Sequence, residues 1–348
     1  MSADATSPLP VSYVLPLRRP APAEPAFGAY VRDLSRVVDE VLVVDGSDDG
    51  VFAAHAADWG EAVTHLPPDR AFVTANGKVA GVLTGLARAR HDAVVIADDD
   101  VRYDRASLAE VVRRLGRAEA VLPQNVFRPL PWHARWDTGR ILVQRALGGD
   151  MGGTVAVRRA FLAGIGGYDG DVMFENLELL RTIRAAGGRV EHARDVFVPR
   201  EPPTAARFAS QRVRQAYDEL ARPWRLAVSL AALPALAIAA RRRPALALGA
   251  FAAGAAVLAE AGRRRDGGRE AFGPTASLWA PAWAFERAVT SWLAVGARLR
   301  GGVRYRDGRI LRAATPSRAL RRRFRERGLP GWAPAALPTP DVGAEAAA

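Results

Sequence analysis

Three consecutive aspartates, Asp98, Asp99 and Asp100, directly follow the apolar run 93–97. The run has the length and composition of a buried strand, and three like charges at its end repel one another unless they are hydrated or paired. A divalent cation relieves that repulsion, because hard cations take carboxylate oxygens and also bridge phosphates. We therefore expect a metal and diphosphate site at the carboxyl end of a parallel strand. A solvated acidic turn is the alternative.

Composition narrows the class of protein further. The 348 residues are 49% hydrophobic, which supports a packed core, and the absence of cysteine excludes disulfides and thiolate metal sites. The net charge is +12, and arginines recur through 298–327 with only Asp307 and Glu326 as acids. Such a patch suits anionic lipid headgroups or nucleic acid. Residues 1–10 are polar and show no signal peptide, so we expect a cytoplasmic catalytic domain.

Strand and helix patterns alternate through the first half of the chain. Strands are predicted at 11–17, 41–44, 93–97 and 121–123, and helices at 28–38, 76–90, 107–115 and 174–186. This alternation predicts an α/β fold with a mostly parallel sheet flanked by helices.

Composition shifts after Pro223. The apolar segments 226–240 and 245–261 are separated by three arginines, which makes shallow insertion as plausible as two spanning helices; two soluble helices packed on the first domain are a further alternative. Tryptophans in 275–297 favour a membrane interface. We expect four regions: a disordered terminus at 1–10, a catalytic domain at 11–207, a helical membrane-associated region at 208–300, and a basic, then Pro/Ala-rich tail at 301–348, disordered from 330.

Four short motifs stand in the order and spacing of one enzyme family. They are the strand ending at Asp45 before a Gly-Ser-rich turn, Asn76-Gly77-Lys78 before a helix and the three aspartates, the loop 166–169 followed by 174–179, and Gln211-Arg212-Val213-Arg214. On these motifs the chain resembles family 2 glycosyltransferases, which have the GT-A fold, and is similar to their membrane-associated, lipid-directed, ceramide glucosyltransferase-like members. The resemblance covers about residues 11–215.

The resemblance implies a nucleotide-sugar donor and Mn2+ or Mg2+ as cofactor. By it, Asp98 contacts the ribose or the metal, Asp99 belongs to the donor site, and Asp100 coordinates the metal that binds the diphosphate. Such a cation offsets the charge that develops on the departing nucleotide.

The same resemblance places the nucleobase near the ends of the first two strands. Asp45 is expected to hydrogen-bond the base edge beside the backbone of Pro16, and Lys78, the only lysine, is expected to contact the base or the phosphates. A simple turn former and a surface residue at a helix start are the respective alternatives.

The general base is where the chain departs from the family pattern. An inverting transferase needs a carboxylate that deprotonates the acceptor hydroxyl, and Asn176 stands where the family has aspartate. We expect Glu175 to serve instead, with Asp169 and Glu178 as further catalytic candidates. Charges favoured at a helix N-terminus are the alternative for both glutamates.

The last motif predicts contacts to the acceptor or the diphosphate. Gln211, Arg212 and Arg214 are expected to clamp them, although Gln215 stands where the family has tryptophan, and an arginine face near the membrane is the alternative. Trp132 and His133 are expected to line the acceptor groove, or else to belong to an ordinary packed loop.

Together, the motifs and the apolar segments favour an inverting, metal-dependent transferase at the cytoplasmic membrane face, with a lipid or polyprenyl acceptor. A non-catalytic protein that binds nucleotide sugars is the alternative, because Asn176 replaces the expected aspartate. Nucleic acid is not an expected partner, since the basic residues lie beside apolar and Trp-rich segments. No Gly-x-Gly-x-x-Gly follows the first strand, which disfavours a nicotinamide oxidoreductase.

Overall fold

A seven-stranded sheet forms the centre of the protein, whose computed structural model describes residues 7–305 and 308–327. The strand order is β3-β2-β1-β4-β6-β5-β7, and within this sheet β6 alone runs against its neighbours. The strands are β1 (Leu9–Leu17), β2 (Val38–Asp45), β3 (Thr64–Leu66), β4 (Ala93–Ala97), β5 (Ala120–Phe127), β6 (Thr154–Arg158) and β7 (Val190–Arg200). The predicted α/β fold with a mostly parallel sheet is therefore confirmed.

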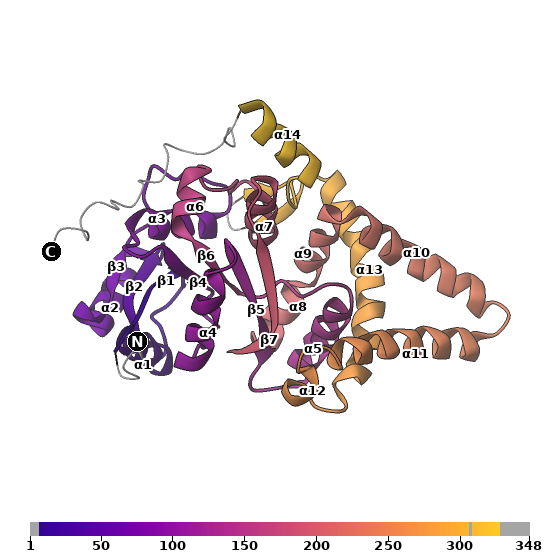
Figure 1. The fold of residues 1–348 in the computed structure, drawn as a ribbon. Helices are drawn as coiled ribbons and strands as arrows, with labels where there is room; N and C mark the ends of the chain where they lie inside the picture. The colour runs from indigo at the N-terminus through magenta and orange to yellow at the C-terminus, as the bar shows by residue number, and fades with distance from the viewer. Residues whose placement is uncertain (1–6, 306–307, 328–348) are drawn as a thin grey trace.

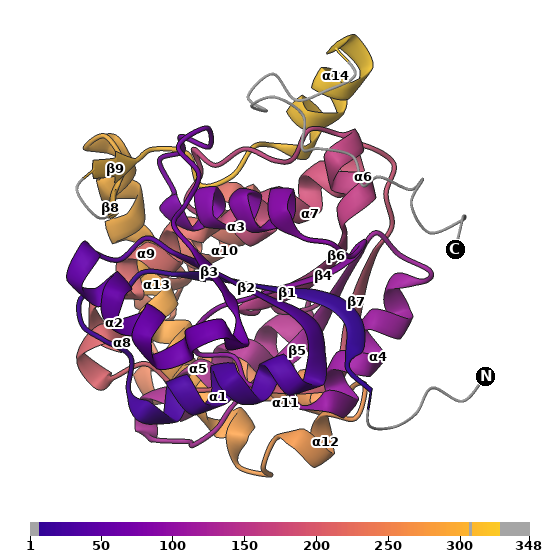
Figure 2. The same cartoon turned by 90° about the vertical axis from the view of Figure 1, so that its left-hand side faces the viewer.

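Helices cover both faces of this sheet (Figures 1 and 2). Strand β1 shows why, because Tyr13 and Leu15 belong to one apolar core and Val14 to the other, as alternation along a strand requires. One face carries α1 (Pro25–Val37), α2 (Asp49–Trp59) and α4 (Arg105–Leu115); the other carries α3 (Gly77–Arg88), α6 (Arg159–Gly164) and α7 (Glu175–Ala185). The two cores hold the strand ends in fixed positions.

Some elements differ from the sequence-based expectation. The sheet begins at Leu9, so residues 9 and 10 are ordered rather than disordered, and the antiparallel strand β6 was not anticipated. The segment around Trp132 forms a helix, α5 (Trp132–Ala146), instead of a loop. Because its buried positions mix polar and apolar residues, its sequence carries no clear apolar stripe. The disorder expected at 330–348 lies outside the described residues.

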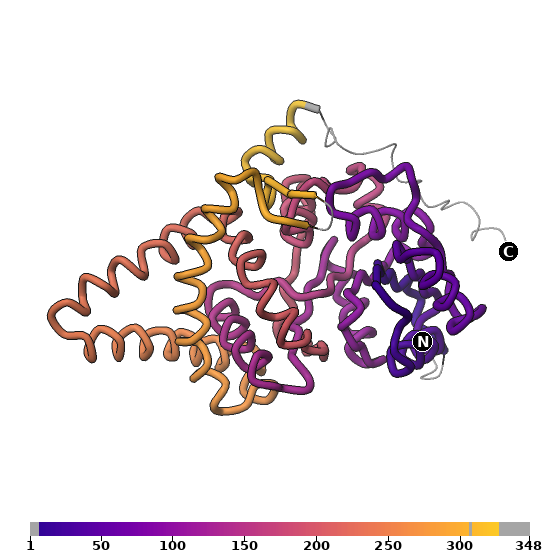
Figure 3. Tube along the Cα trace, turned by 180° about the vertical axis from the view of Figure 1, so that it is seen from behind, coloured from indigo at the N-terminus to yellow at the C-terminus, as the bar shows by residue number. Residues whose placement is uncertain are grey.

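A helical hairpin projects from the domain (Figures 1 and 3). It consists of α10 (Pro223–Ala240) and α11 (Pro244–Arg263), both long and apolar enough to cross a membrane. No residue of α10 is buried, and α11 is buried only near its end, where Gly262 meets α5 so closely that a Cβ would lie 1.9 Å from the Leu142 carbonyl oxygen. The hairpin is thus anchored at its base and exposed along its length.

The remaining elements join the hairpin to the sheet. Helix α13 (Ala280–Leu299) packs against α5, α10 and α11, and the segment after it folds back on α7, where the Thr315 backbone nitrogen donates to Glu178 Oε2 (2.6 Å). The other elements are α8 (Ala205–Ser210), α9 (Arg212–Tyr217), α12 (Gly268–Ala271), α14 (Ser317–Arg327), β8 (Val303–Tyr305), β9 (Gly308–Ile310) and the 3-10 turns η1 (Gly60–Ala62), η2 (Asp218–Ala221) and η3 (Ala276–Trp279).

Candidate active site

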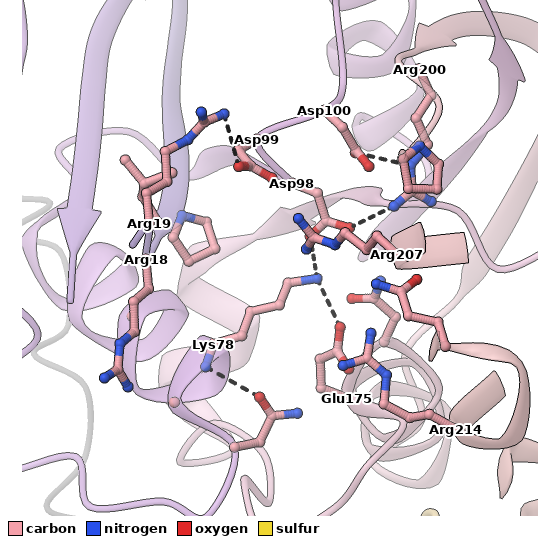
Figure 4. A pocket seen from close by; sticks show the side chains of 18 of the residues that line it. Arg18, Arg19, Lys78, Asp98, Asp99, Asp100, Glu175, Arg200, Arg207 and Arg214 are labelled. Atoms are coloured by element: carbon pink, nitrogen blue, oxygen red, sulfur yellow. Dashed lines mark hydrogen bonds and ion pairs between the residues drawn. The ribbon is translucent and has the colours of Figure 1, made fainter. Parts of the chain in front are cut away.

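A cleft of about 860 Å³ opens where β1 and β4 end. Its walls come from the segments after these strands, the starts of α3 and α7, the end of β7, and α8, α9 and η2. Charged side chains from several of these elements point toward one another across it (Figure 4). The residues predicted from sequence that line the cleft are Pro16, Lys78, Asp98, Asp99, Asp100, Glu175, Gln211 and Arg214.

Lys78 connects two of the predicted carboxylates. Its Nζ lies 2.5 Å from Asp98 Oδ1 and 2.7 Å from Glu175 Oε1 (Figure 4). The lysine is held at the start of α3, where the Asn76 side chain caps the helix by accepting from the Lys78 backbone nitrogen. The only lysine of the chain therefore bridges the end of β4 and the start of α7.

Arginines compensate the other two aspartates. Arg200 Nε donates to Asp100 Oδ1 at 2.9 Å, and its Nη2 lies 3.4 Å from Asp98 Oδ2. Arg19 Nη2 lies 3.1 Å from Asp99 Oδ2. Asp98 and Asp100 thus direct carboxylate oxygens toward one shared cation, whereas Asp99 turns toward the segment after β1.

These contacts shift the two carboxyl groups in opposite directions. Burial opposes ionisation of Asp98, but the charges of Lys78 and Arg200 outweigh it and hold its pKa below the ordinary value. Burial raises the pKa of Asp100, and the neighbouring charges of Asp98 and Asp99 raise it further against the opposing effect of Arg200. Of these two carboxylates, Asp100 is therefore the one whose charge a second cation would stabilise more.

Asp45 does not line the cleft, although Val44 and Gly46 on either side of it do, and its contact with a nucleobase stays a prediction. It is 1% exposed; its Oδ1 accepts from the Ser47 backbone nitrogen, and its Oδ2 lies 2.7 Å from His55 Nδ1 and 3.2 Å from His65 Nε2. Burial opposes ionisation, but the hydrogen bonds from His65, Ser47 and His55 hold the Asp45 pKa well below its usual range. His55 Nε2 accepts a hydrogen bond from the Ala23 backbone nitrogen. The ring hydrogen is therefore on Nδ1, which donates to Asp45 Oδ2.

Asp169 and Glu178 also lie outside the cleft lining. Asp169 is buried and lies 2.5 Å from Arg312 Nη2. Glu178 is buried against the returning C-terminal segment, and burial raises its pKa, partly offset by hydrogen bonds from Thr315. Both carboxylates hold the fold together at the base of α7.

The residues of the last motif, Gln211, Arg212 and Arg214, lie in two different surroundings. Gln211 and Arg214 line the cleft, whereas Arg212 is buried, with Nη1 3.0 Å from Asp137 Oδ1 and 3.2 Å from Glu286 Oε2. This ion pair joins α9 to α5 and α13, so Arg212 lies outside the cleft lining.

Trp132 and His133 lie beside the cleft without lining it. The His133 ring pairs through Nε2 with the Pro203 carbonyl oxygen (2.8 Å), and Trp132 packs edge-on against Phe208 while half exposed. They fix the segment between β7 and α8, which borders the cleft.

Several charged residues of the cleft were not anticipated from sequence. Arg18 and Arg19 follow β1 directly, Arg200 ends β7, and Arg207 and Asp218 come from α8 and η2. The adjacent arginines after the first strand were a usable signal, because charges at a strand end face the ligand edge of such sheets. Arg200 gave none, since its neighbourhood depends on the pairing of β7 with β5.

No curated protein matches the chain. Among solved structures it is similar to a mannosyltransferase from Pyrobaculum calidifontis in complex with GDP-Man and Mn2+ (18% identity, 81% of this chain and 86% of that chain, TM-score 0.46). It is also similar to mannosyl-3-phosphoglycerate synthase from Rubrobacter xylanophilus (20% identity, 60% of this chain and 74% of that chain, TM-score 0.40). A third similar structure is glucosyl-3-phosphoglycerate synthase from Mycobacterium tuberculosis with Mn2+, UDP and glucosyl-3-phosphoglycerate (22% identity, 60% of this chain and 77% of that chain, TM-score 0.40).

One family model matches residues 28–218, which is more than half of the chain, and its description is "Glycosyltransferase like family 2". The matched region contains β4 and α7, the elements beside which the cleft carboxylates Asp98, Asp99, Asp100 and Glu175 stand. The chain therefore belongs to the family 2 glycosyltransferases.

Proposed function

We propose that the protein transfers a sugar from a nucleoside diphosphate donor to a lipid or lipid-linked acceptor at the cytoplasmic face of a membrane, with inversion at the sugar carbon. The observation that carries this proposal is the cluster of Asp98, Asp99 and Asp100 with Lys78 and Arg200 in one cleft of a family 2 domain. Such a cluster offers both carboxylates for a cation and cations for phosphates.

The aspartates fit a divalent cation. Asp98 and Asp100 already converge on Arg200, and carboxylate oxygens are the ligands that Mg2+ and Mn2+ prefer. We assign these two residues to the metal, which when bound supplies Lewis-acid stabilisation of the charge on the departing nucleotide. Lys78 and Arg200 add fixed positive charge to the same region, and Arg18, Arg207 and Arg214 line the cleft without an ion-pair partner among the described residues.

The hairpin supports a membrane-associated acceptor. Apolar side chains of α10 and α11 are exposed, among them Val228, Leu246 and Val257, and exposed apolar surface of this extent marks an interaction site. Helix α13 lies across the base of the hairpin and also exposes Trp292, a residue that favours membrane interfaces. The segment 212–221 runs from the cleft wall to the start of α10, and this short connection supports a cleft close to the proposed membrane surface.

The charge around the hairpin supports a cytoplasmic catalytic domain. Arginines at its base, on the side of the domain, outnumber the three at its tip: Arg222, Arg225, Arg263, Arg264 and Arg265 against Arg241, Arg242 and Arg243. Positive residues favour the cytoplasmic side of a membrane segment.

The test follows a labelled sugar. Purified protein in detergent with Mn2+ receives labelled UDP-, GDP- and dTDP-sugars and total membrane lipid, and label is counted in the organic-solvent extract. We expect one donor to label the lipid fraction. Label confined to water-soluble acceptors contradicts the lipid acceptor, and nucleotide-sugar binding without any transfer contradicts the enzymatic proposal.

A further inference from the structure

Asp218 differs from every other carboxylate that lines the cleft. Each of the others lies within 3.4 Å of an arginine or lysine nitrogen, as Glu175 does of Lys78 and Asp137 of Arg212. The Asp218 backbone nitrogen donates to the Ala216 carbonyl oxygen, but within residues 7–305 and 308–327 no group forms a hydrogen bond or ion pair with the Asp218 carboxylate. Its oxygens are therefore free to accept a proton from a bound molecule.

The position of Asp218 is on the wall of the cleft that leads to the hairpin. It is the first residue of η2, directly after α9, and α10 begins five residues later at Pro223. Arg214 of the same wall lies opposite Arg18 and Arg19 in the cleft (Figure 4). An acceptor that enters from the membrane side therefore meets this wall, while the donor aspartates follow β4.

The surroundings of Asp218 suit proton transfer near neutral pH. Loss of hydration in the cleft raises the pKa of Asp218 to about 7. The positive charges of Arg287 and Arg222 oppose this rise, and the negative charges of Glu175 and Glu219 add to it. A general base works best when its pKa lies near the operating pH.

The other candidates for this role are less available. Asn176 donates through Nδ2 to the Gly152 carbonyl oxygen (3.0 Å), and an amide does not accept the proton of a hydroxyl. Glu175 is held by Lys78 at 2.7 Å, and Asp169 and Glu178 do not line the cleft. Asp218, which does not stand at the family position of the base, is thus the cleft carboxylate left free to accept the proton.

We infer that Asp218 is the general base of the transfer, an assignment that rests on the proposed function. The acceptor oxygen forms a bond to the anomeric carbon, and its proton passes to the Asp218 carboxylate. The bond from the anomeric carbon to the phosphate oxygen breaks, and its electron pair leaves with the nucleoside diphosphate.

The experiment compares Asp218→Asn with Asp218→Glu and with Glu175→Gln as the matched variant. Released nucleotide is measured between pH 5.5 and 9 with Mn2+, membrane lipid and a panel of UDP-, GDP- and dTDP-sugars. Donor binding is measured by calorimetry, and thermal unfolding checks that each variant folds. Loss of a general base typically lowers turnover by about 10²–10⁴-fold.

We expect the wild-type rate to rise with pH through about 7. Asp218→Asn should lose at least about 100-fold and this rise, yet bind the donor within a few-fold of wild type. Asp218→Glu should recover part of the activity. Glu175→Gln should keep a rise of rate with pH, displaced to lower pH because Glu175 no longer adds to the pKa of Asp218. A residue with only a structural role would change the unfolding temperature without moving the pH profile.

Two results would overturn the assignment. Turnover by Asp218→Asn within about threefold of wild type, with the pH dependence retained, removes Asp218 alone from the mechanism and leaves the transferase standing. Folded wild-type protein that binds no donor and releases no nucleotide overturns the proposed function, and the base assignment with it.

Discussion

Lys78 Nζ lies 2.5 Å from Asp98 Oδ1, which ties the start of α3 to the end of β4 inside the cleft. The same ammonium reaches Glu175 at 2.7 Å, so one lysine separates two carboxylates that would otherwise repel each other. Burial opposes the charged form of Lys78, but Asp98 and Glu175 outweigh it and raise the lysine pKa above its ordinary value. The lysine therefore stays protonated throughout the neutral range.

Replacing Lys78 with methionine should make the protein more dependent on a divalent cation. The two carboxylates lose their shared counter-charge, and we expect a loss of about 1–3 kcal/mol in the free energy of unfolding in EDTA, less than for a fully buried pair. Mn2+ should restore more stability to Lys78→Met than it adds to wild type. Urea unfolding with and without Mn2+ measures this, with Lys78→Arg as control. Equal Mn2+ effects in all three proteins would contradict the proposed metal position.

Asp45 should stabilise the fold in a pH-dependent way. Its folded-state pKa is depressed, so its contribution is fully present above the unfolded value of about 3.9 and is lost as pH falls through the folded value. We expect Asp45→Asn to cost about 1–3 kcal/mol at pH 7. Urea unfolding should show a constant difference from wild type between pH 5 and 8 that narrows below pH 4. A difference that widens on acidification would contradict the depressed pKa.

Replacing either of two glycines of α11 with alanine should change the stability of the protein, in opposite directions. A Cβ at Gly262 would overlap the Leu142 carbonyl oxygen, whereas nothing lies within 4 Å of a Cβ at Gly254. Gly262→Ala should therefore separate α11 from α5 and lower the unfolding temperature, because backbone cannot yield as a flexible side chain does. Gly254→Ala should stabilise the helix by about 0.5–1 kcal/mol. Calorimetry of both variants measures this, and equal shifts would contradict the close packing at Gly262.

A charge on the hairpin should weaken membrane binding. Leu246 is 61% exposed on α11, so Leu246→Glu should leave the fold intact while it costs about 2–3 kcal/mol in a bilayer. Flotation with anionic vesicles measures the bound fraction. Val73→Glu is the matched control, since Val73 is 89% exposed in the segment before α3 and does not belong to the hairpin. Equal flotation of the two variants would contradict insertion of the hairpin.

The sheet was predictable from sequence because its central strands are short apolar runs with abrupt ends. Pro16 lies near the end of β1, Asp45 ends β2, and Asp98 follows β4, so each strand end could be located from local signals. The antiparallel β6 was not predictable in this way, since its direction depends on pairing with β4 and β5. The local sequence therefore predicts where a strand lies but not which strands it pairs with in the sheet.

The site was predictable in part for the same reason. Lys78, Glu175 and the three aspartates stand beside element ends, and the structure brings them into one cleft. The surroundings of Asp45 depend on His55 and His65, which arrive from α2 and β3, so no local pattern showed that the carboxylate is enclosed. Asp218 belongs to no sequence motif. It stands out only in the structure, where the other carboxylates that line the cleft have cationic partners and the Asp218 carboxylate has none among the described residues.

Nucleotide release by wild type and Asp100→Ala tests the central claim most directly. Protein with Mn2+ and membrane lipid is offered UDP-, GDP- and dTDP-sugars, and Asp195→Ala, a substitution at a surface ion pair, serves as control. We predict release from one donor by wild type and by the control, and a loss of about 100-fold or more in Asp100→Ala. No release from any donor by folded wild type, or equal release by Asp100→Ala, would contradict the account.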